Sequence, residues 1–508
     1  MEITLASNQI DCYEQIGKGT LVSEETAECV VSDLLPDIAG ILDADGWIAI
    51  QTKSADPGKV SVTATVSITV LYQPDDSSGI RRIPVSIPCS IGFELPEMTE
   101  QAIPVVRLEL ESVDARILNP RKILVRAGIR AEMECYRAGV ISLPCAVQQS
   151  PENSIRTLDA RCGFTRIAGV HEKTVVLTEE SQIPAALPPI GELFKSRVDA
   201  VVEDVKPVGN KLILKGSFRT SVLYAGLDGG ELCAHEMTTA FSQIVEAAAV
   251  LGDPMAEISL VPAAIYVELM DNAGDRRKLG VEAHFVVQVV CRETAEIAYL
   301  ADAYDPYRDL MLQTETKRIS SCLRPAVLRE SVRELIELQH GVEEVLHVYA
   351  LPGAATVKDG TIQCPIRVQM LYRSETSTVC RAEARYTVES SQEVENGAAL
   401  VIREVRCGEA YAVPAAGGIE VRVPVELLGA IMQEQEITAV TGIAPAETTE
   451  GEAREKPSLY LLQTDPTDTI WALAKRYGST PELIRAANEM EAEEEAGQRL
   501  LLIPRAGM

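Results

Sequence analysis

Three stretches of the chain alternate apolar and polar residues and end in the pair Leu-Tyr. They run from Val62 to Tyr72, from Leu212 to Tyr224 and from Ile362 to Tyr372, with largely apolar even-numbered positions until the terminal Leu. A period of two is typical of a β-strand with one buried face. The three leucines stand 152 and 148 residues apart, so we predict three copies of one β-rich unit.

The segments around these strands predict hairpins. Turn-like stretches follow each Leu-Tyr pair, and more alternating stretches come later in each unit; the turns are 73–79, 226–230 and 373–377, and the strands are 82–87, 123–129, 281–289 and 419–425. Short strands at hairpin spacing are typical of an antiparallel sandwich or barrel. Pro365 and Pro424 lie within such strands and predict edge positions or bulges.

Two further segments extend the comparison between the units. Leu35–Leu42 recurs 152 residues later as Leu187–Phe194, and a third copy is not obvious near Leu335. A helical period is clear in Pro325–Leu338, where we expect a connecting helix.

The composition changes after the third unit. Residues 439–458 are rich in Pro, Gly, Ala and Glu without periodicity, which is typical of a flexible linker. We expect β-rich repeats at 1–150, 151–305 and 306–438, this linker, and a small module at 459–508. The predicted fold class is mainly β, with three tandem antiparallel repeats, sandwich- or barrel-like, before a small βααβ domain.

The C-terminal module has the pattern strand, helix, helix, strand. We expect Asp468 to cap the first helix and Gly478 to end it. Thr480 and Pro481 begin the second helix, and residues 497–504 form the closing strand. A module of this size has a small core, so Trp471 is expected to supply a large share of its buried area; the predicted structural core is Trp471, Leu473, Tyr477 and Ile503.

Charge and targeting signals narrow the function classes. The chain of 508 residues has a formal net charge of −28 and no clustered Lys/Arg stripe, so we do not expect nucleic-acid binding. The N-terminus has an acid where a signal peptide needs basic residues, and no run of about 18 uncharged apolar residues predicts a membrane span. We expect a protein that stays in the cytoplasm where it is made.

Residues that commonly carry catalysis form no recognisable constellation. The five histidines are in no HExxH motif, and the chain has no GxSxG elbow or phosphate-binding loop. The twelve cysteines include no CxxC pair; they are typical of reduced core residues, with late oxidative cross-linking as the alternative. We therefore expect no enzyme activity, no cofactor and no metal.

The C-terminal module resembles the LysM family. The resemblance rests on Asp468–Trp471, Leu473–Gly478, Pro481–Leu483, Asn488, Gly497-Gln498 and Ile503-Pro504. It implies a βααβ fold, and many LysM modules bind N-acetylglucosamine glycans in a groove between two loops. The groove positions implied here are Thr467, Asp468, Thr469 and Ile470 on one loop and Met490 and Glu491 on the other.

The module departs from the family pattern. Thr467 stands where the family usually has Gly, the loop at 464–466 is short, and the loop at 489–495 contains five acids. Because peptidoglycan also bears carboxylates, an acidic rim weakens its capture. Glycan binding and protein docking both stay open, and a folded module without a ligand is the third alternative.

The order of three β-rich repeats and a LysM resembles spore coat morphogenetic proteins of the SipL/SpoVID type, in which SPOCS domains precede a C-terminal LysM. The resemblance implies a non-catalytic scaffold at the forespore surface, on the mother-cell side. It also implies a coat-basement ATPase of the SpoIVA type and other coat proteins as partners. The alternatives are a phage tail or baseplate adaptor and a cell-wall-associated LysM protein.

Overall fold

The structure is a computed structural model of the whole chain. It describes all residues except 1–2, 76–78, 97, 100, 149–153, 228–231, 248–254, 271–273, 377, 396, 447–456, 492–493 and 508. Parts of the three predicted turns, Asp76–Ser78, Asp228–Gly230 and Ser377, lie outside the described residues.

Three successive sets of antiparallel strands make up most of the chain, and we call them repeats 1, 2 and 3. Repeat 1 contains β1 (Leu5–Val30), β2 (Ile38–Asp56), β3 (Lys59–Pro74), β4 (Arg81–Glu94), β5 (Ile103–Asn119) and β6 (Lys122–Val147). Repeat 2 contains β7 (Arg156–Gln182), β8 (Ile190–Val208), β9 (Lys211–Gly226), β10 (Leu232–Glu246), β11 (Met255–Met270) and β12 (Lys278–Tyr304). Repeat 3 contains β13 (Leu310–Glu337), β14 (Val342–Pro352), β15 (Thr356–Lys358), β16 (Thr361–Ser374), β17 (Val379–Ser391), β18 (Ala398–Cys407), β19 (Tyr411–Ala415) and β20 (Gly418–Pro445).

Each repeat is a sandwich of two antiparallel sheets. In repeat 1, β2-β3-β4 covers the sheet that contains β1, β6 and β5, and repeat 2 has the same order with β8-β9-β10 and β7-β12-β11. The core of repeat 1 holds the alternating apolar side chains of β3 and β6, from Val60 to Tyr72 and from Ile123 to Cys135. The predicted fold class is confirmed, and the three Leu-Tyr strands are β3, β9 and β16, the middle strands of their sheets.

A tyrosine side chain binds the loop that precedes the first strand of the sheet β2-β3-β4, and an equivalent tyrosine does so for the sheet β8-β9-β10. The hydroxyl of Tyr72 donates to the carbonyl oxygen of Pro36, and that of Tyr224 donates to the carbonyl oxygen of Pro188, each at 3.0 Å. These contacts explain why Leu35–Leu42 and Leu187–Phe194 resemble each other, because both segments form the same loop and strand start.

The predictions of a connecting helix and of the start of the linker are wrong. Pro325–Leu338 is not a helix: β13 runs through it and pairs with β20, with Pro325 opposite Ala430. Pairing with a neighbouring strand here outweighs the local helical period. The linker was also predicted to begin too early, because residues 439–445 belong to β20 and pair with β13 as far as Leu310 opposite Pro445. The rest of that segment, 447–456, lies outside the described residues.

The two prolines occupy breaks between neighbouring strands. Pro365 pairs with β17 on one side, and on the other side it lies between the end of β14 and the start of β15. Pro424 likewise lies between β18 and β19. A proline lacks the N–H group that a continuous ladder needs, so each proline stands where the ladder is interrupted.

The three repeats close around a common centre. β3 of repeat 1 contacts β8 of repeat 2, β10 contacts β14 of repeat 3, and β17 contacts β2 of repeat 1. The leucines of the three Leu-Tyr pairs, Leu71, Leu223 and Leu371, are all buried in one cluster. Each leucine stands at a position where the alternation of its strand would place a polar residue. It is apolar because the outer faces of the three sheets that contain β3, β9 and β16 meet there.

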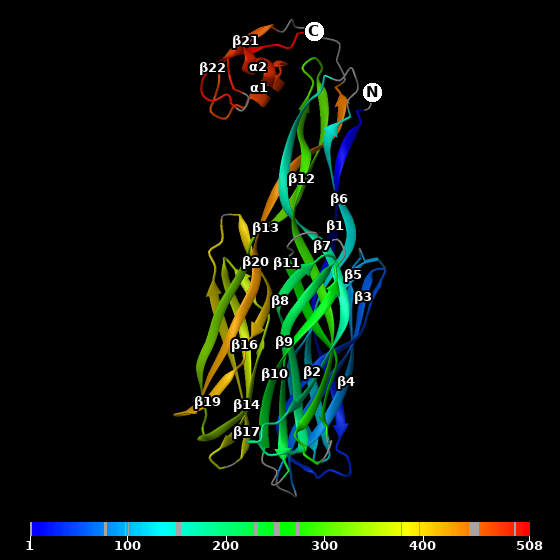
Figure 1. Ribbon diagram of the computed structural model, residues 1–508, viewed down its shortest axis with the longest axis vertical. Helices are drawn as coiled ribbons and strands as arrows, with labels where there is room; N and C mark the ends of the chain where they lie inside the picture. The colour runs from blue at the N-terminus through cyan, green and yellow to red at the C-terminus, as the bar shows by residue number, and fades with distance from the viewer. Residues whose placement is uncertain are drawn as a thin grey trace.

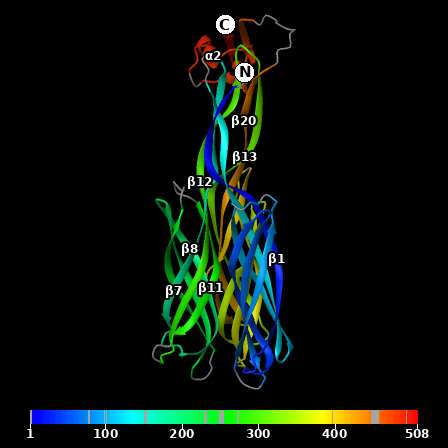
Figure 2. The same ribbon diagram turned by 90° about the vertical axis from the view of Figure 1, so that its right-hand side faces the viewer.

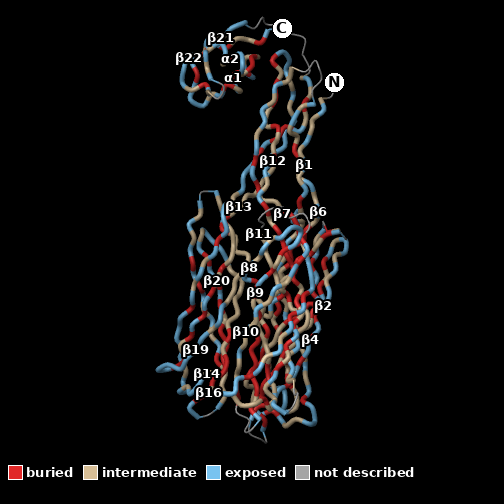
Figure 3. The backbone as a smooth tube through the Cα atoms, viewed as in Figure 1, coloured by how far each residue is buried: buried red, intermediate tan, exposed pale blue. Residues whose placement is uncertain are grey.

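The molecule is elongated, with a wide body and a narrow stalk (Figures 1 and 2). The stalk consists of the ends of three long antiparallel pairs, β1 with β6, β7 with β12 and β13 with β20. Its core is shared by all three repeats and includes Leu143, Phe164 and Ile437. Buried positions run along the strands of the wide body (Figure 3). Among the described residues, no helix has the length and apolarity that a membrane crossing requires.

Candidate functional site

The C-terminal module lies at the narrow end of the molecule (Figure 1). It consists of β21 (Leu459–Gln463), α1 (Ile470–Tyr477), α2 (Pro481–Ala487) and β22 (Leu500–Pro504), and the two strands pair antiparallel. This confirms the predicted order of strand, helix, helix and strand.

The helix ends differ in one respect from the prediction. The N-cap of α1 is Thr469, whose side chain accepts a hydrogen bond from the Ala472 N–H at 3.1 Å. Asp468 instead accepts from the Asp465 N–H at 2.8 Å and closes the preceding turn. Gly478 ends α1 in the left-handed region with φ of 67°, as predicted.

Trp471 is not part of the module's core, contrary to the prediction. The core is made by small and aliphatic residues, Ile470, Leu473, Ala474, Ile484, Ala496, Leu501 and Ile503. Trp471 and Tyr477 are only partly buried at its margin, and Tyr477 packs against Tyr460 with ring centroids 4.7 Å apart. Leu473 and Ile503 are core residues as predicted.

Trp471 attaches the module to the end of β12. Its indole Nε1 donates to Oδ2 of Asp302 at 2.8 Å, and its ring meets Tyr304 edge-on at 4.9 Å. Lys475 pairs with Oδ1 of the same Asp302 at 2.5 Å. Tyr304 is 4% exposed and belongs to the module's apolar cluster, although it lies in repeat 2.

Two more hydrogen bonds complete this attachment. The hydroxyl of Tyr304 donates to the carbonyl oxygen of Ser479 at 3.0 Å, and the hydroxyl of Tyr307 donates to that of Gly507 at 2.8 Å. We call the contacts of Asp302, Tyr304 and Tyr307 with the module the latch. The latch could not be predicted from the sequence, because the spacing of apolar residues in α1 does not indicate contacts with residues at the end of repeat 2.

The predicted groove residues lie at the start of α1 and in the two loops that precede α1 and follow α2. Thr467, Thr469 and Glu491 are exposed, and Asp468 and Met490 are partly buried. The Ile470 side chain is only 1% exposed and faces the core, so it cannot line a groove. Its N–H donates to Oε2 of Glu495 at 3.1 Å, which joins the two loops.

Several of the predicted acids already have partners within the module. Oε2 of Glu494 accepts from the Glu491 N–H at 3.1 Å, and its Oε1 accepts from Arg499 at 2.6 Å. The hydrogen bond from Arg499 is the main reason that the pKa of Glu494 is lowered. Glu493 lies outside the described residues. The described part of this loop is therefore less repulsive toward anions than its composition predicts.

A buried ionic centre lies where the three repeats meet. Asp43, Lys195 and His347 are each paired with the leucine of a Leu-Tyr strand, Leu71, Leu223 and Leu371 respectively, so they occupy equivalent positions. An acid, a base and a neutral ring thus stand at one position of the repeat. Two residues further on, the equivalent positions hold Asp45, Arg197 and Tyr349.

The charges of the ionic centre neutralise one another. Nζ of Lys195 lies 3.2 Å from Asp43 and 2.7 Å from Asp45. Burial alone would raise the pKa of Asp45, but Lys195 and Arg197 outweigh it and lower the pKa well below its usual range. Burial, and then Lys195, lowers the pKa of His347 to about 3, so this ring is neutral near pH 7. Buried cations therefore keep Asp45 charged, and the ionic centre contributes to packing between the repeats.

Within the described ranges, no group of three or more His, Cys, Asp and Glu side chains is arranged to hold a metal ion. His340 and His347 do not share a site: His347 belongs to the ionic centre, where Nδ1 finds no hydrogen-bond partner among described residues.

Comparison with known protein families places two modules on this chain. A family model described as SipL, SPOCS domain matches residues 37–118, and a LysM domain model matches residues 466–502. The first match covers β2 to β5 of repeat 1, and the second covers both helices of the C-terminal module. No curated protein and no solved structure matches the chain.

Proposed function

We propose that this chain, whose SPOCS and LysM domains match the SipL/SpoVID-type architecture of spore coat morphogenetic proteins, is a non-catalytic tether in spore coat assembly. SPOCS and LysM are binding domains, and together they associate the chain with sporulation and peptidoglycan binding. In the proposal, the LysM module contacts the glycan and the repeats carry the coat.

The observation that carries the proposal is the geometry of the latch. The module is attached through Trp471, Lys475 and Ser479, while Thr467 and Glu491 stay exposed on its loops. A glycan chain can therefore approach the loops without displacing the module from the stalk. Since three strand pairs build the stalk, the loops are presented on a long and stiff support.

The contact residues proposed for the glycan are Thr467, Asp468, Thr469, Met490 and Glu491, without Ile470, whose side chain is buried and whose N–H is bonded to Glu495. Short polar side chains and backbone groups suit the hydroxyl and acetamido groups of N-acetylglucosamine, which both donate and accept hydrogen bonds. The internal partners of Glu494 and Glu495 reduce the acidic barrier to a wall polymer.

The proposed location is the mother-cell side of the forespore surface. The proposed protein partners are a coat-basement ATPase of the SpoIVA type and other coat proteins, which would bind the surfaces of the repeats. Several repeats on one support allow multivalent attachment, in which the second contact forms at high effective concentration. Docking of the LysM module to such a protein is the alternative use of the same loops.

Sedimentation of the full-length protein with insoluble peptidoglycan tests the glycan contact. We expect the unaltered chain to pellet, and the double variant Thr467→Glu/Met490→Glu to stay in the supernatant because two added carboxylates repel the wall polymer at the loops. Ala472→Glu/Ala486→Glu is the charge-matched control, since both alanines are exposed on the helices and neither is a groove residue. Equal pelleting of the double variant and the unaltered chain would refute the groove assignment.

A fluorescent fusion tests the location. In sporulating cells of the source organism we expect a shell around the forespore, and loss of that shell when residues 459–508 are deleted. Diffuse fluorescence of the intact fusion would count against a coat tether, whatever the glycan assay shows.

A further inference from the structure

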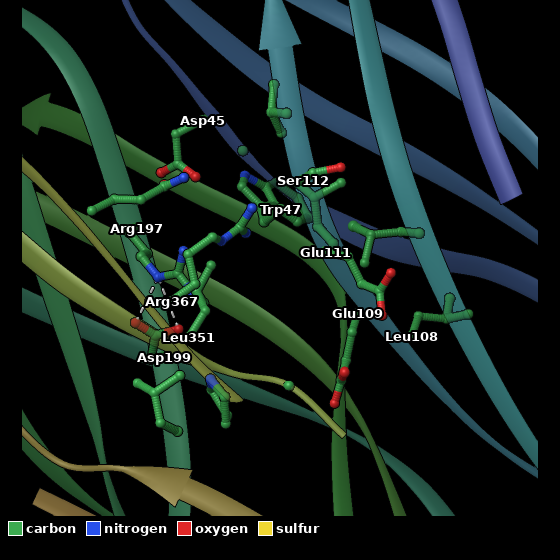
Figure 4. A pocket seen from close by; sticks show the side chains of 18 of the residues that line it. Asp45, Trp47, Leu108, Glu109, Glu111, Ser112, Arg197, Asp199, Leu351 and Arg367 are labelled. Atoms are coloured by element: carbon green, nitrogen blue, oxygen red, sulfur yellow. Dashed lines mark hydrogen bonds and ion pairs between the residues drawn. The ribbon is translucent and has the colours of Figure 1, made fainter. Parts of the chain in front are cut away.

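A pocket of about 490 Å³ opens beside the ionic centre and is lined by all three repeats (Figure 4). Repeat 1 contributes Asp45–Ile48 of β2 and Leu108–Val113 of β5, and repeat 3 contributes the end of β14 and residues Pro365–Arg367 of β16. Repeat 2 contributes Arg197–Asp199 of β8 and Pro262 of β11, and Gln369 and Arg385 of repeat 3 also line it. We call it the edge pocket, because β2 and β5 are both the last strands of their sheets.

The edge of β5 is unpaired along this pocket. Among the strands that the structure describes, β5 pairs with β6 alone, and on its other side the backbone of Val106 is bound by the side chain of Gln288. That side chain accepts from the Val106 N–H at 2.9 Å and donates to its carbonyl oxygen at 2.6 Å. It thereby occupies the place that a further strand would take.

The backbone groups of a strand point to alternate sides with a period of two. Leu108 and Leu110 therefore direct their N–H and C=O groups to the same side as Val106, toward the edge pocket. Beyond them the register shifts between Leu110 and Ser112, which ends the regular edge. The free edge is short, with Gln288 at one end and this bulge at the other.

Two charged side chains at the edge pocket also lack partners. Among the described residues, the partly buried Arg367 and the exposed Glu109 make no hydrogen bond and no ion pair, in contrast to Arg197, which is held by Asp199 at 2.9 Å. Burial lowers the pKa of Arg367, and nearby Glu383 only partly offsets this effect. Figure 4 shows Glu109 and Glu111 on the β5 side of the pocket and Arg197 with Asp199 on the other.

We propose that the edge pocket binds a short extended peptide segment of a partner protein, which pairs with the edge of β5 at Leu108 and Leu110. An acidic side chain of the peptide pairs with Arg367, and a basic side chain pairs with Glu109. Addition of a strand to an exposed sheet edge is a common mode of peptide recognition, with affinity from the main chain and specificity from side-chain pockets. This site is independent of glycan binding by the LysM module.

Two features favour a peptide over a free zwitterion such as an amino acid. The free edge offers backbone donors and acceptors at two residues of the same side, which only another extended backbone satisfies together. The volume also fits a segment of several residues better than one amino acid. A peptide with acidic and basic side chains two residues apart presents both on one face.

Isothermal titration of the full-length protein tests the site with capped pentapeptides. The probe is acetyl-Val-Glu-Val-Lys-Val-amide, and the comparison probes are the neutral analogue with Gln at both charged positions and a form with N-methylated backbone amides. We expect saturable binding of the charged probe, and about tenfold weaker binding to Arg367→Gln or Glu109→Gln. Arg329→Gln, exposed in repeat 3 and paired with Glu426, is the matched control and should bind normally.

The outcomes separate the possible ligands. Protection of the Leu108 and Leu110 amides from hydrogen exchange by the charged probe, and loss of binding on N-methylation, would support pairing with the edge. Equal binding of free glutamate or lysine, undiminished binding of the N-methylated probe, or no binding by any probe at millimolar concentration would overturn the proposal. Arg367→Lys checks folding, because it keeps the charge and should retain part of the affinity.

Discussion

Trp471 and Asp302, 169 residues apart in sequence, are joined by a hydrogen bond of 2.8 Å between the indole Nε1 and a carboxylate oxygen. The same carboxylate binds Lys475. A single acid at the end of β12 therefore fixes one face of α1, and the LysM module has a defined orientation on the stalk.

Loss of the latch should release the module without unfolding the repeats. Tyr304→Ala removes an aromatic ring that is 4% exposed, so we expect the module to lose about 2–4 kcal/mol of stability against unfolding. Hydrogen exchange of the α1 amides measures this loss. Tyr307→Phe, which removes one exposed hydrogen bond, should change it by no more than about 1 kcal/mol. Unchanged protection of α1 in Tyr304→Ala would show that the latch does not stabilise the module.

His347 should make the protein sensitive to acid. Its pKa is about 3 in the folded chain and about 6.5 when unfolded, so between these values the unfolded state binds more protons. The contribution is complete above pH 6.5 and declines as the pH falls toward 3, with a slope of up to about 1.4 kcal/mol per pH unit. Urea unfolding at several pH values measures it.

The control for this pH dependence is Ile366→Val. Ile366 is buried in the core of repeat 3 and has no titratable group, so the substitution should lower the stability by a similar amount at every pH and leave the slope unchanged. His347→Gln should flatten the slope between pH 6.5 and 3. A slope that is the same in His347→Gln and in the unaltered protein would contradict a buried neutral ring.

Lys195 should be the residue on which the ionic centre depends most. Lys195→Met leaves Asp43 and Asp45 buried without their closest cation, and we expect a loss of about 3–5 kcal/mol. Lys206→Met, which breaks an exposed pair with Asp204, should cost less than about 1 kcal/mol. Denaturant unfolding compares them; similar midpoints for both variants would mean that the centre is not electrostatically coupled.

Gly216 should tolerate no side chain. A Cβ there would lie 2.0 Å from the carbonyl oxygen of Val201, so Gly216→Ala must shift the backbone of β8 or β9 and should cost about 1–3 kcal/mol. Gly163 is also in a strand, but nothing lies within 4 Å of its added Cβ. Gly163→Ala should therefore be neutral within about 0.5 kcal/mol in the same thermal unfolding experiment.

Much of the fold could be predicted because most strands bury one face in the core of their own repeat, which makes apolar and polar residues alternate. Val62 to Val70 alternate since one face of β3 covers the core of repeat 1. The helix expected at Pro325–Leu338 failed for the opposite reason. The side chains of β13 have mixed surroundings, with Val332 in the core and Val327 exposed, so its pattern carried no clear period of two.

The contacts between repeats were beyond sequence reasoning, although one signal was present. Leu71, Leu223 and Leu371 break the alternation at the same place, and a break shared by three copies could have indicated a second buried face. The ionic centre gave no such signal, because Asp43, Lys195 and His347 share a position but no chemistry. For the LysM module, the helix positions were predictable, while the role of Trp471 depended on Asp302 in another repeat.

The closure of β3 on β8, β10 on β14 and β17 on β2 fixes the number of units. A linear array of repeats can gain or lose a member at its end and keep its remaining interfaces. Here every unit has two neighbours, so deleting one would uncover apolar and charged faces on both others, and a fourth would find no vacant place. The three units are therefore arranged like the subunits of a closed trimer, but they are linked in one polypeptide. Because the order of the units is fixed by the chain, equivalent positions such as those of Asp43, Lys195 and His347 can differ without units assembling in the wrong order.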